Sequence, residues 1–190
     1  MRLRVGAAMP EKGGRPCVIG VEVRRGRDRK GRRAWHFVVG QVDRVQPGTV
    51  ERTAERVREM IEPVLDLRPC VMVDVGTPQG LALRQHMRNS REDPWPRQLH
   101  RPHAYPRDSK EQLFAGFLEA YAAGRVEFLP DLPHRADLDR SLVFYLGAGQ
   151  AKDGFELESE DEAMVRALGL ALVWPSHGPE ANTHSPAGVV

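Results

Sequence analysis

Three acidic positions, far apart in the chain, lie in or beside apolar segments, and their carboxylates have the chemistry to bind cations together. Glu22 lies within one apolar run, Asp74 ends a second, and Asp161 with Glu162 begins an apolar helix. A carboxylate in such surroundings is costly to desolvate unless a cation meets it. Carboxylate oxygens are ligands that Mg²⁺ and Mn²⁺ prefer, and two such ions can activate water against a phosphodiester. The pattern therefore predicts a metal-dependent site that cleaves phosphodiester bonds.

Each acid also has a simpler interpretation. Glu22 is two residues from Arg24 and could pair with it, with its carboxylate in water. Asp74 precedes a glycine-containing turn and could serve as a turn former or helix cap. Asp161 and Glu162 could complement the dipole of the helix that they begin. Because the acids occur together in one ordered pattern, we expect a cluster.

A second feature is the uneven distribution of basic residues, although the net charge is only +2. A dense run of them separates two apolar segments, and a lysine further on begins a helix. The predicted nucleic-acid contacts are Arg24, Arg25, Arg27, Arg29, Lys30, Arg32, Arg33 and Lys110. Such a run can face a polyanion or can simply be a solvated loop, and Lys110 can likewise be a solvated helix residue. His100 and His103 have no third ligand nearby, which favours a surface or phosphate-contacting pair over zinc.

The elements that must position these residues follow from the spacing of apolar side chains. Two strands flank the basic run as a hairpin, and later strands alternate with helices. The order predicts an α/β fold, with a β-meander followed by alternating helices and strands in a mixed sheet flanked by helices. The expected strands are 17–23, 34–42, 70–75 and 126–129, and the expected helices start at residues 49, 81, 109, 136 and 160.

The length of 190 residues and the 41% hydrophobic content fit one domain. We expect a loose leader or a short edge strand over residues 1–14, the domain over 15–176 and a flexible tail over 177–190. Two cysteines are too few for a cysteine-based zinc site and are expected to be buried as thiols. No apolar run is long enough to span a membrane, and no signal peptide is evident, so a cytoplasmic protein is expected.

This order of elements resembles the ribonuclease H-like fold, and three local motifs resemble the nuclease domain of phage terminase large subunits. Residues 71–83 resemble the strand, glycine-rich turn and helix that carry the family's second acid. Residues 108–129 resemble its lysine-containing helix with a Gly-Arg-Val exit. Residues 160–171 resemble its C-terminal helix, which usually opens with His-Asp-Asp.

The resemblance implies a DNA endonuclease that uses two Mg²⁺ or Mn²⁺ ions. It would place Glu22 and Asp74 on adjacent central strands, with Glu162 or Asp161 supplying the third ligand from the last helix. DNA would be the substrate, and phage packaging or recombination proteins would be possible partners. The sequence departs from the family by a glutamate at the first acid and by Ala163 at a family acid position, and it has no phosphate-binding loop of an ATPase.

Two other functions remain open at this point. The same fold with a degraded site would serve as a DNA-binding or assembly module of a phage-derived system. A nuclease of the Holliday-junction resolvase type would use the same fold on branched DNA. The oligomeric state does not follow from the sequence.

Overall fold

The computed structural model describes residues 2–10, 14–28, 30–46, 48–89, 100–103, 117–148 and 159–173, with the backbone alone at 100–103, 144–148, 159–161 and 173. The elements are β1 (Arg2–Ala8), β2 (Cys17–Arg27), β3 (Arg33–Arg44), α1 (Val50–Ile61), η1 (Glu62–Leu67), β4 (Cys70–Asp74), α2 (Pro78–Asn89), β5 (His100–His103), β6 (Val126–Phe128), α4 (Arg135–Ala148) and α5 (Ser159–Val173). Residues 117–122 are also helical. In the described part of the chain, no helix has the length and apolar character needed to cross a membrane.

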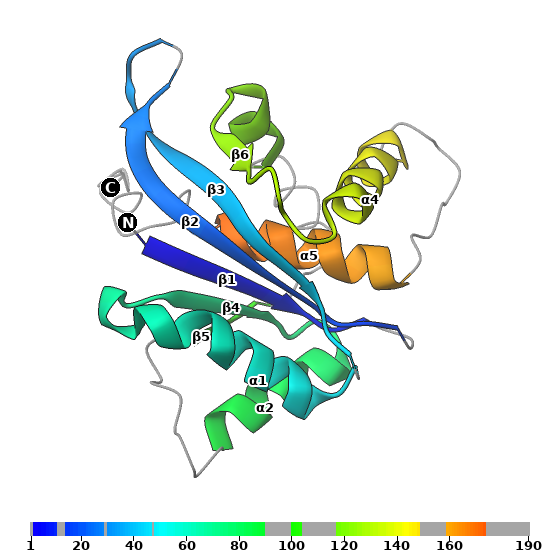
Figure 1. Ribbon diagram of the computed structural model, residues 1–190. Helices are drawn as coiled ribbons and strands as arrows, with labels where there is room; N and C mark the ends of the chain where they lie inside the picture. Colours follow the sequence, from blue (N-terminus) through cyan, green and yellow to red (C-terminus); the bar gives the residue numbers. More distant parts are fainter. Residues whose placement is uncertain are drawn as a thin grey trace, which may run out of the picture.

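The strands form one six-stranded sheet in the order β5-β4-β1-β2-β3-β6 (Figure 1). The first three strands are an antiparallel meander, whereas β4 runs parallel to β1 and β5 runs parallel to β4. The short strand β6 runs parallel to β3 at the other edge. This is the order and direction expected for a ribonuclease H-like sheet, so the predicted fold class is confirmed.

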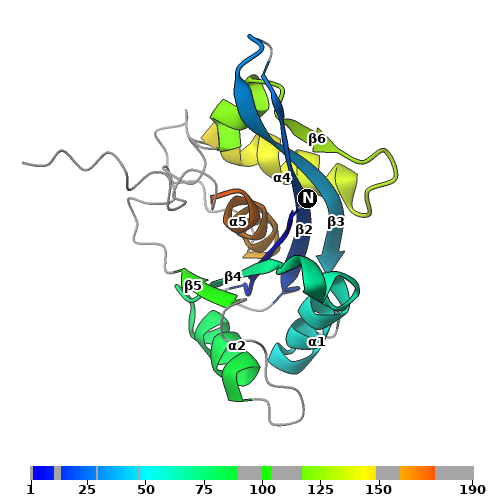
Figure 2. The ribbon, with the colours of Figure 1, turned by 90° about the vertical axis from the view of Figure 1, so that its left-hand side faces the viewer.

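Helices cover both faces of the sheet. On one face α5 crosses β1, β2 and β4, and Met164 and Leu168 pack there in a core that includes Ile19 (Figures 1 and 2). On the other face α1 and α2 pack beneath β1 and β4, and Val5 and Val57 belong to that second core. Alternation along each strand therefore decides which helices a side chain meets.

The first strand corrects the predicted domain boundaries. A loose leader or a short edge strand was expected over residues 1–14, but Arg2–Ala8 form β1 inside the sheet, between β4 and β2, so the domain begins before residue 15. The strand gave a weak sequence signal because two arginines and the small residues Gly6, Ala7 and Ala8 interrupt its apolar character. The predicted tail over 177–190 lies outside the described residues.

Gly6 explains why this strand contains small residues. A Cβ atom added at Gly6 would lie 1.9 Å from the carbonyl oxygen of Ala167, on α5. The backbone of α5 therefore approaches β1 to a distance that only glycine allows. This close approach fixes the height of α5 over the carboxyl end of β4, where Asp74 lies.

Replacing Gly6 with alanine is expected to lower the free energy of unfolding by about 1–3 kcal/mol, because α5 must move off the sheet. Urea unfolding followed by circular dichroism measures this change. The matched control is Gly40→Ala in β3, where the added Cβ meets only Leu129 Cδ1 at 3.5 Å. Equal stability of the two variants would contradict the close approach.

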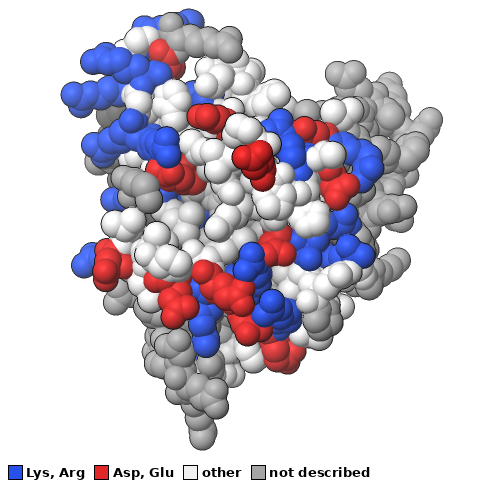
Figure 3. Space-filling model, in the orientation of Figure 1, with Lys and Arg blue, Asp and Glu red and all other residues white. Residues whose placement is uncertain are grey.

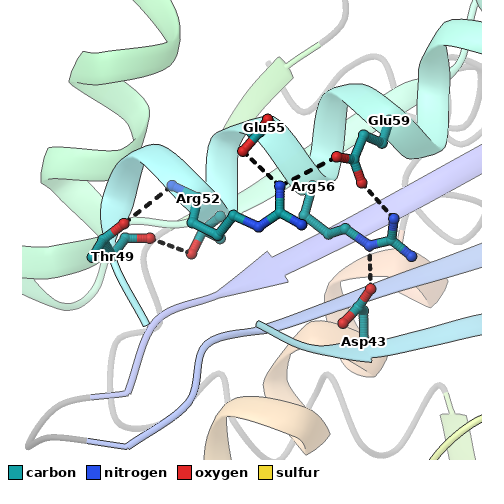
Figure 4. Close-up of polar contacts among 7 residues, drawn as sticks. Asp43, Thr49, Arg52, Glu55, Arg56 and Glu59 are labelled. Atoms are coloured by element: carbon teal, nitrogen blue, oxygen red, sulfur yellow. Dashed lines mark hydrogen bonds and ion pairs between the residues drawn. The ribbon is translucent and has the colours of Figure 1, made fainter. Parts of the chain in front are cut away.

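The exposed face of α1 shows how this protein balances surface charge (Figure 4). Thr49 caps the helix by accepting a hydrogen bond from the backbone N–H of Arg52. Arg52 contacts Glu55 and Glu59, and Arg56 contacts Glu59 and Asp43. Arg52 and Arg56 on this surface are therefore each paired with two carboxylates.

Candidate functional site

Asp74 occupies the carboxyl end of β4 and faces α5. Val71 and Val73 point into the core beneath α1 and α2. Because side chains alternate along a strand, Met72 and Asp74 point to the opposite face. The Asp74 side chain is completely buried. Its Oδ1 accepts a hydrogen bond of 2.8 Å from the backbone N–H of Gly76, which begins the turn into α2. Asp74 is therefore both buried and part of the turn that leads into α2.

The cation that meets Asp74 is the guanidinium group of Arg166, from the middle of α5. Arg166 Nε lies 3.2 Å from Asp74 Oδ2, and the arginine side chain is only 5% exposed. Arg166 Nη2 donates a hydrogen bond of 2.6 Å to the carbonyl oxygen of Met9, just beyond β1. The guanidinium thus ties together the ends of β4 and β1 beneath the helix.

Glu162 lies one helical turn before Arg166 and contacts the same guanidinium. Arg166 Nη1 is 3.9 Å from Glu162 Oε1. Two of the predicted acids, Asp74 and Glu162, therefore contact the same guanidinium. Both carboxylates face the Arg166 guanidinium. The side chain of Asp74 is fully buried, whereas that of Glu162 is 19% exposed.

The residue of β1 that lies beside Asp74 is an alanine, whose side chain has no atom that could bind a metal. The parallel register pairs Ala7 with Val73, so Ala8 lies next to Asp74. The sequence of β1 contains no aspartate or glutamate. The resemblance assigns the first acid to the first strand, and in this protein that strand presents Ala8.

Glu22 does not join this cluster, which corrects the sequence prediction. It pairs in register with Leu3, whereas Ala8 pairs with Cys17, so Glu22 lies at the opposite end of β1 from Asp74. Five residues of strand separate the two levels, about 17 Å at 3.3 Å a residue. Leu3 packs against the core of α1 and α2, so Glu22 also lies on the opposite face of the sheet.

The simpler interpretation of Glu22, an ion pair with Arg24, is confirmed. Arg24 Nε and Nη2 donate hydrogen bonds of 2.6 and 2.7 Å to the two carboxylate oxygens of Glu22. These hydrogen bonds hold the pKa of Glu22 below its usual value and raise that of Arg24. Because β1 precedes β2 in the chain, β2 is the second strand, and Glu22 does not have the position that the resemblance gives to the first acid.

The remaining predicted positions are partly outside the described residues. The backbone of Asp161 lies in the first turn of α5, but its side chain is not described. Arg29 and Lys110 also lie outside the described residues. His100 and His103 begin and end β5, described by its backbone only.

In the described part of the chain, the residues of this site do not fit the two metal ions that the resemblance implies. Mg²⁺ requires near-octahedral oxygen ligands at about 2.0–2.1 Å, whereas α5 places the cationic Arg166 Nε 3.2 Å from Asp74 Oδ2. Among the residues whose side chains are described, no three His, Cys, Asp or Glu residues form a group that could hold a metal. Cys17 and Cys70 are free thiols. Cys17 is buried, as expected, and burial raises its pKa strongly, whereas Cys70 is only partly buried.

The basic hairpin is the second candidate site. Strands β2 and β3 extend beyond the rest of the sheet, and their tip carries a concentration of lysine and arginine (Figures 1 and 3). Within the described residues its exposed cations are Arg24, Arg25, Arg27, Lys30, Arg32 and Arg33. Two of them are ion-paired, Arg24 with Glu22 and Arg32 with Asp28. The hairpin therefore keeps a surplus of positive charge, unlike α1.

Comparison with known proteins adds one structural similarity. No family model matches the sequence, and no curated protein matches it. The chain is similar to the human cytomegalovirus terminase nuclease domain, at 15% sequence identity and a TM-score of 0.45. The similarity covers 93% of this chain and 84% of that one.

Arg166 is the functional residue that the sequence prediction missed. It is the one charged residue between Ala163 and Val173, within a helix whose other residues there are apolar or glycine. Its position was the available signal, because a charge on a buried helix face needs a partner. The identity of that partner, Asp74, follows only from the placement of α5 over β4.

Proposed function

We propose that this protein is a DNA-binding module on a ribonuclease H-like fold, in which an arginine side chain takes the place of catalytic metal ions. The observation that carries the proposal is the buried Arg166, which contacts Asp74 and Glu162 where a metal would be needed. Ala8 beside Asp74 supports it further, because a first-strand ligand is missing there. In this proposal the protein keeps the fold, and the acid cluster stabilises it through the ion pair with Arg166 instead of binding metal ions.

The hairpin supports DNA as the ligand. Arginine binds phosphate oxygens through charge-assisted hydrogen bonds and needs no particular base sequence. Contacts of this kind release counterions, so affinity falls steeply with salt. A surplus of arginines on a projecting hairpin is suited to this mode of binding.

A metal-dependent nuclease is the second candidate, because Asp74 and Glu162 both contact the guanidinium of Arg166 and so lie near each other. For this activity Arg166 would have to leave the cluster when Mg²⁺ or Mn²⁺ entered. That exchange would break the ion pair with Asp74 and the hydrogen bond to Met9. The two candidates differ in whether a divalent ion affects binding and cleavage.

Fluorescence anisotropy with labelled DNA tests the proposal. We expect binding to short DNA at low salt, unchanged when EDTA replaces Mn²⁺, and weakening strongly as salt rises. Absence of binding at low salt would contradict the proposal, and a requirement for Mn²⁺ would favour the nuclease. A labelled four-way junction in the same assay tests for a preference for branched DNA.

A further inference from the structure

The hairpin carries a hollow that the proposed DNA contact does not by itself explain. Its volume is about 640 Å³, and it is lined by Arg25, Gly26, Arg27, Arg33, Ala34 and Trp35. This volume lies within the range of about 300–1,000 Å³ that is usual for small-molecule sites. The hollow is therefore large enough for one nucleotide unit.

The register of the hairpin gathers one aromatic ring and three arginines on one face. Arg25 is opposite Trp35, and Arg27 is opposite Arg33. Residues two apart share a face, so these four side chains point to the same side. Within the described part of the chain, none of the three arginines is paired with a carboxylate.

Trp35 holds Arg25 in place. The guanidinium carbon of Arg25 lies 5.0 Å from the centroid of the Trp35 ring, a cation–π contact. Trp35 is half-buried and packs against the core beneath α5, so the ring is anchored. Arg25 is thus pre-positioned above an aromatic surface.

The turn of the hairpin is ordered by Asp28. Its Oδ1 accepts hydrogen bonds of 2.9 Å from the backbone N–H groups of Lys30 and Arg32, and its Oδ2 accepts from Arg32 Nε. On the opposite face, His36 Nε2 lies 2.9 Å from the carbonyl oxygen of Arg27. These contacts hold the backbone from which the arginines extend.

We propose that this hollow binds an unstacked nucleotide of single-stranded DNA, so that the protein prefers single strands to duplex. The inference rests on the proposed DNA-binding function and names its ligand. An exposed base stacks on the Arg25–Trp35 pair, as bases stack on arginine planes and aromatic rings elsewhere. Arg27 and Arg33 contact the flanking phosphates. In a duplex the base faces are already stacked and cannot enter.

The location of the hollow agrees with a binding role separate from the buried acids. Asp74 lies beside Ala8, which pairs with Cys17 at the start of β2. Arg25 is eight residues further along β2, about 26 Å at 3.3 Å a residue. A nucleotide held in the hollow is therefore distant from Asp74 and Glu162.

The test measures the affinities of the intact protein for fluorescein-labelled oligothymidine and for a duplex of equal length, at one salt concentration. We expect oligothymidine to bind more tightly. Arg25→Ala should weaken oligothymidine binding about 5- to 100-fold, the effect of losing one stacked base. Arg24→Ala removes the same charge from the neighbouring residue outside the hollow and should weaken binding less.

Arg25→Lys provides the sharpest comparison, because it keeps the charge and loses the guanidinium plane. A loss of oligothymidine affinity in Arg25→Lys, with duplex affinity unchanged, supports the nucleotide site. Equal effects of Arg24→Ala and Arg25→Ala, or full affinity in Arg25→Lys, overturn it while leaving DNA binding by the hairpin intact. Absence of binding to either DNA would instead overturn the proposed function itself.

Discussion

Replacement of Arg166 by methionine is expected to lower the free energy of unfolding by about 3–5 kcal/mol, the usual cost of removing one partner from a buried ion pair. Asp74 is completely buried, and the variant leaves its carboxylate without the guanidinium 3.2 Å away. The hydrogen bond to the carbonyl oxygen of Met9 is lost as well. Urea unfolding measures the change.

Two companion variants make this prediction specific. Arg140→Met removes an arginine from α4 whose pair with Asp137 is exposed to water, and it should change stability by less than about 1 kcal/mol. Adding Asp74→Asn to Arg166→Met should recover part of the loss, because the uncompensated charge is then gone. A change below about 1 kcal/mol in Arg166→Met would contradict a buried ion pair at this place.

The second large effect concerns the hairpin. Changing Arg25, Arg27 and Arg33 together to glutamine should lower DNA affinity by more than about tenfold at low salt. Each lost phosphate contact reduces the slope of log K against log salt by about 0.7–0.9. The variant should therefore show a slope smaller by about 2 units, measured by anisotropy over a salt series.

The matched control removes the same charge from α1. Arg52, Arg56 and Arg58 changed to glutamine alter the net charge equally, but Arg52 and Arg56 are already paired with carboxylates. This control should keep the slope of the unaltered protein. If both triple variants lose the same affinity, DNA responds to net charge alone and the hairpin is not its binding surface.

The sequence was sufficient for the fold and for part of the acid cluster. The apolar run of β4 and the helical spacing after Glu162 predicted the two elements, and the resemblance to the ribonuclease H-like fold implied that their acids lie near each other. The basic hairpin was equally visible, because two strands flank an unbroken polar run. These features depend on local periodicity, which a sequence displays directly.

The sequence predictions were wrong where a residue type is explained only by contacts between elements distant in the chain. Gly6, Ala7 and Ala8 gave no clear strand signal, since their small size serves the close approach of α5. Without β1, the strand that carries Glu22 counts as the first strand, although it is the second. Arg166 was present in the sequence, but its partner could be found only once α5 was placed over β4.

Incubation of supercoiled plasmid with the purified protein in millimolar Mn²⁺ tests whether Arg166 takes the place of catalytic metal ions. The assay is run at a salt concentration where a band shift shows that the plasmid is bound. We predict bound plasmid that remains supercoiled, with the same result in EDTA. Nicking by the unaltered protein that disappears in Asp74→Asn would contradict the claim and establish a metal-dependent nuclease.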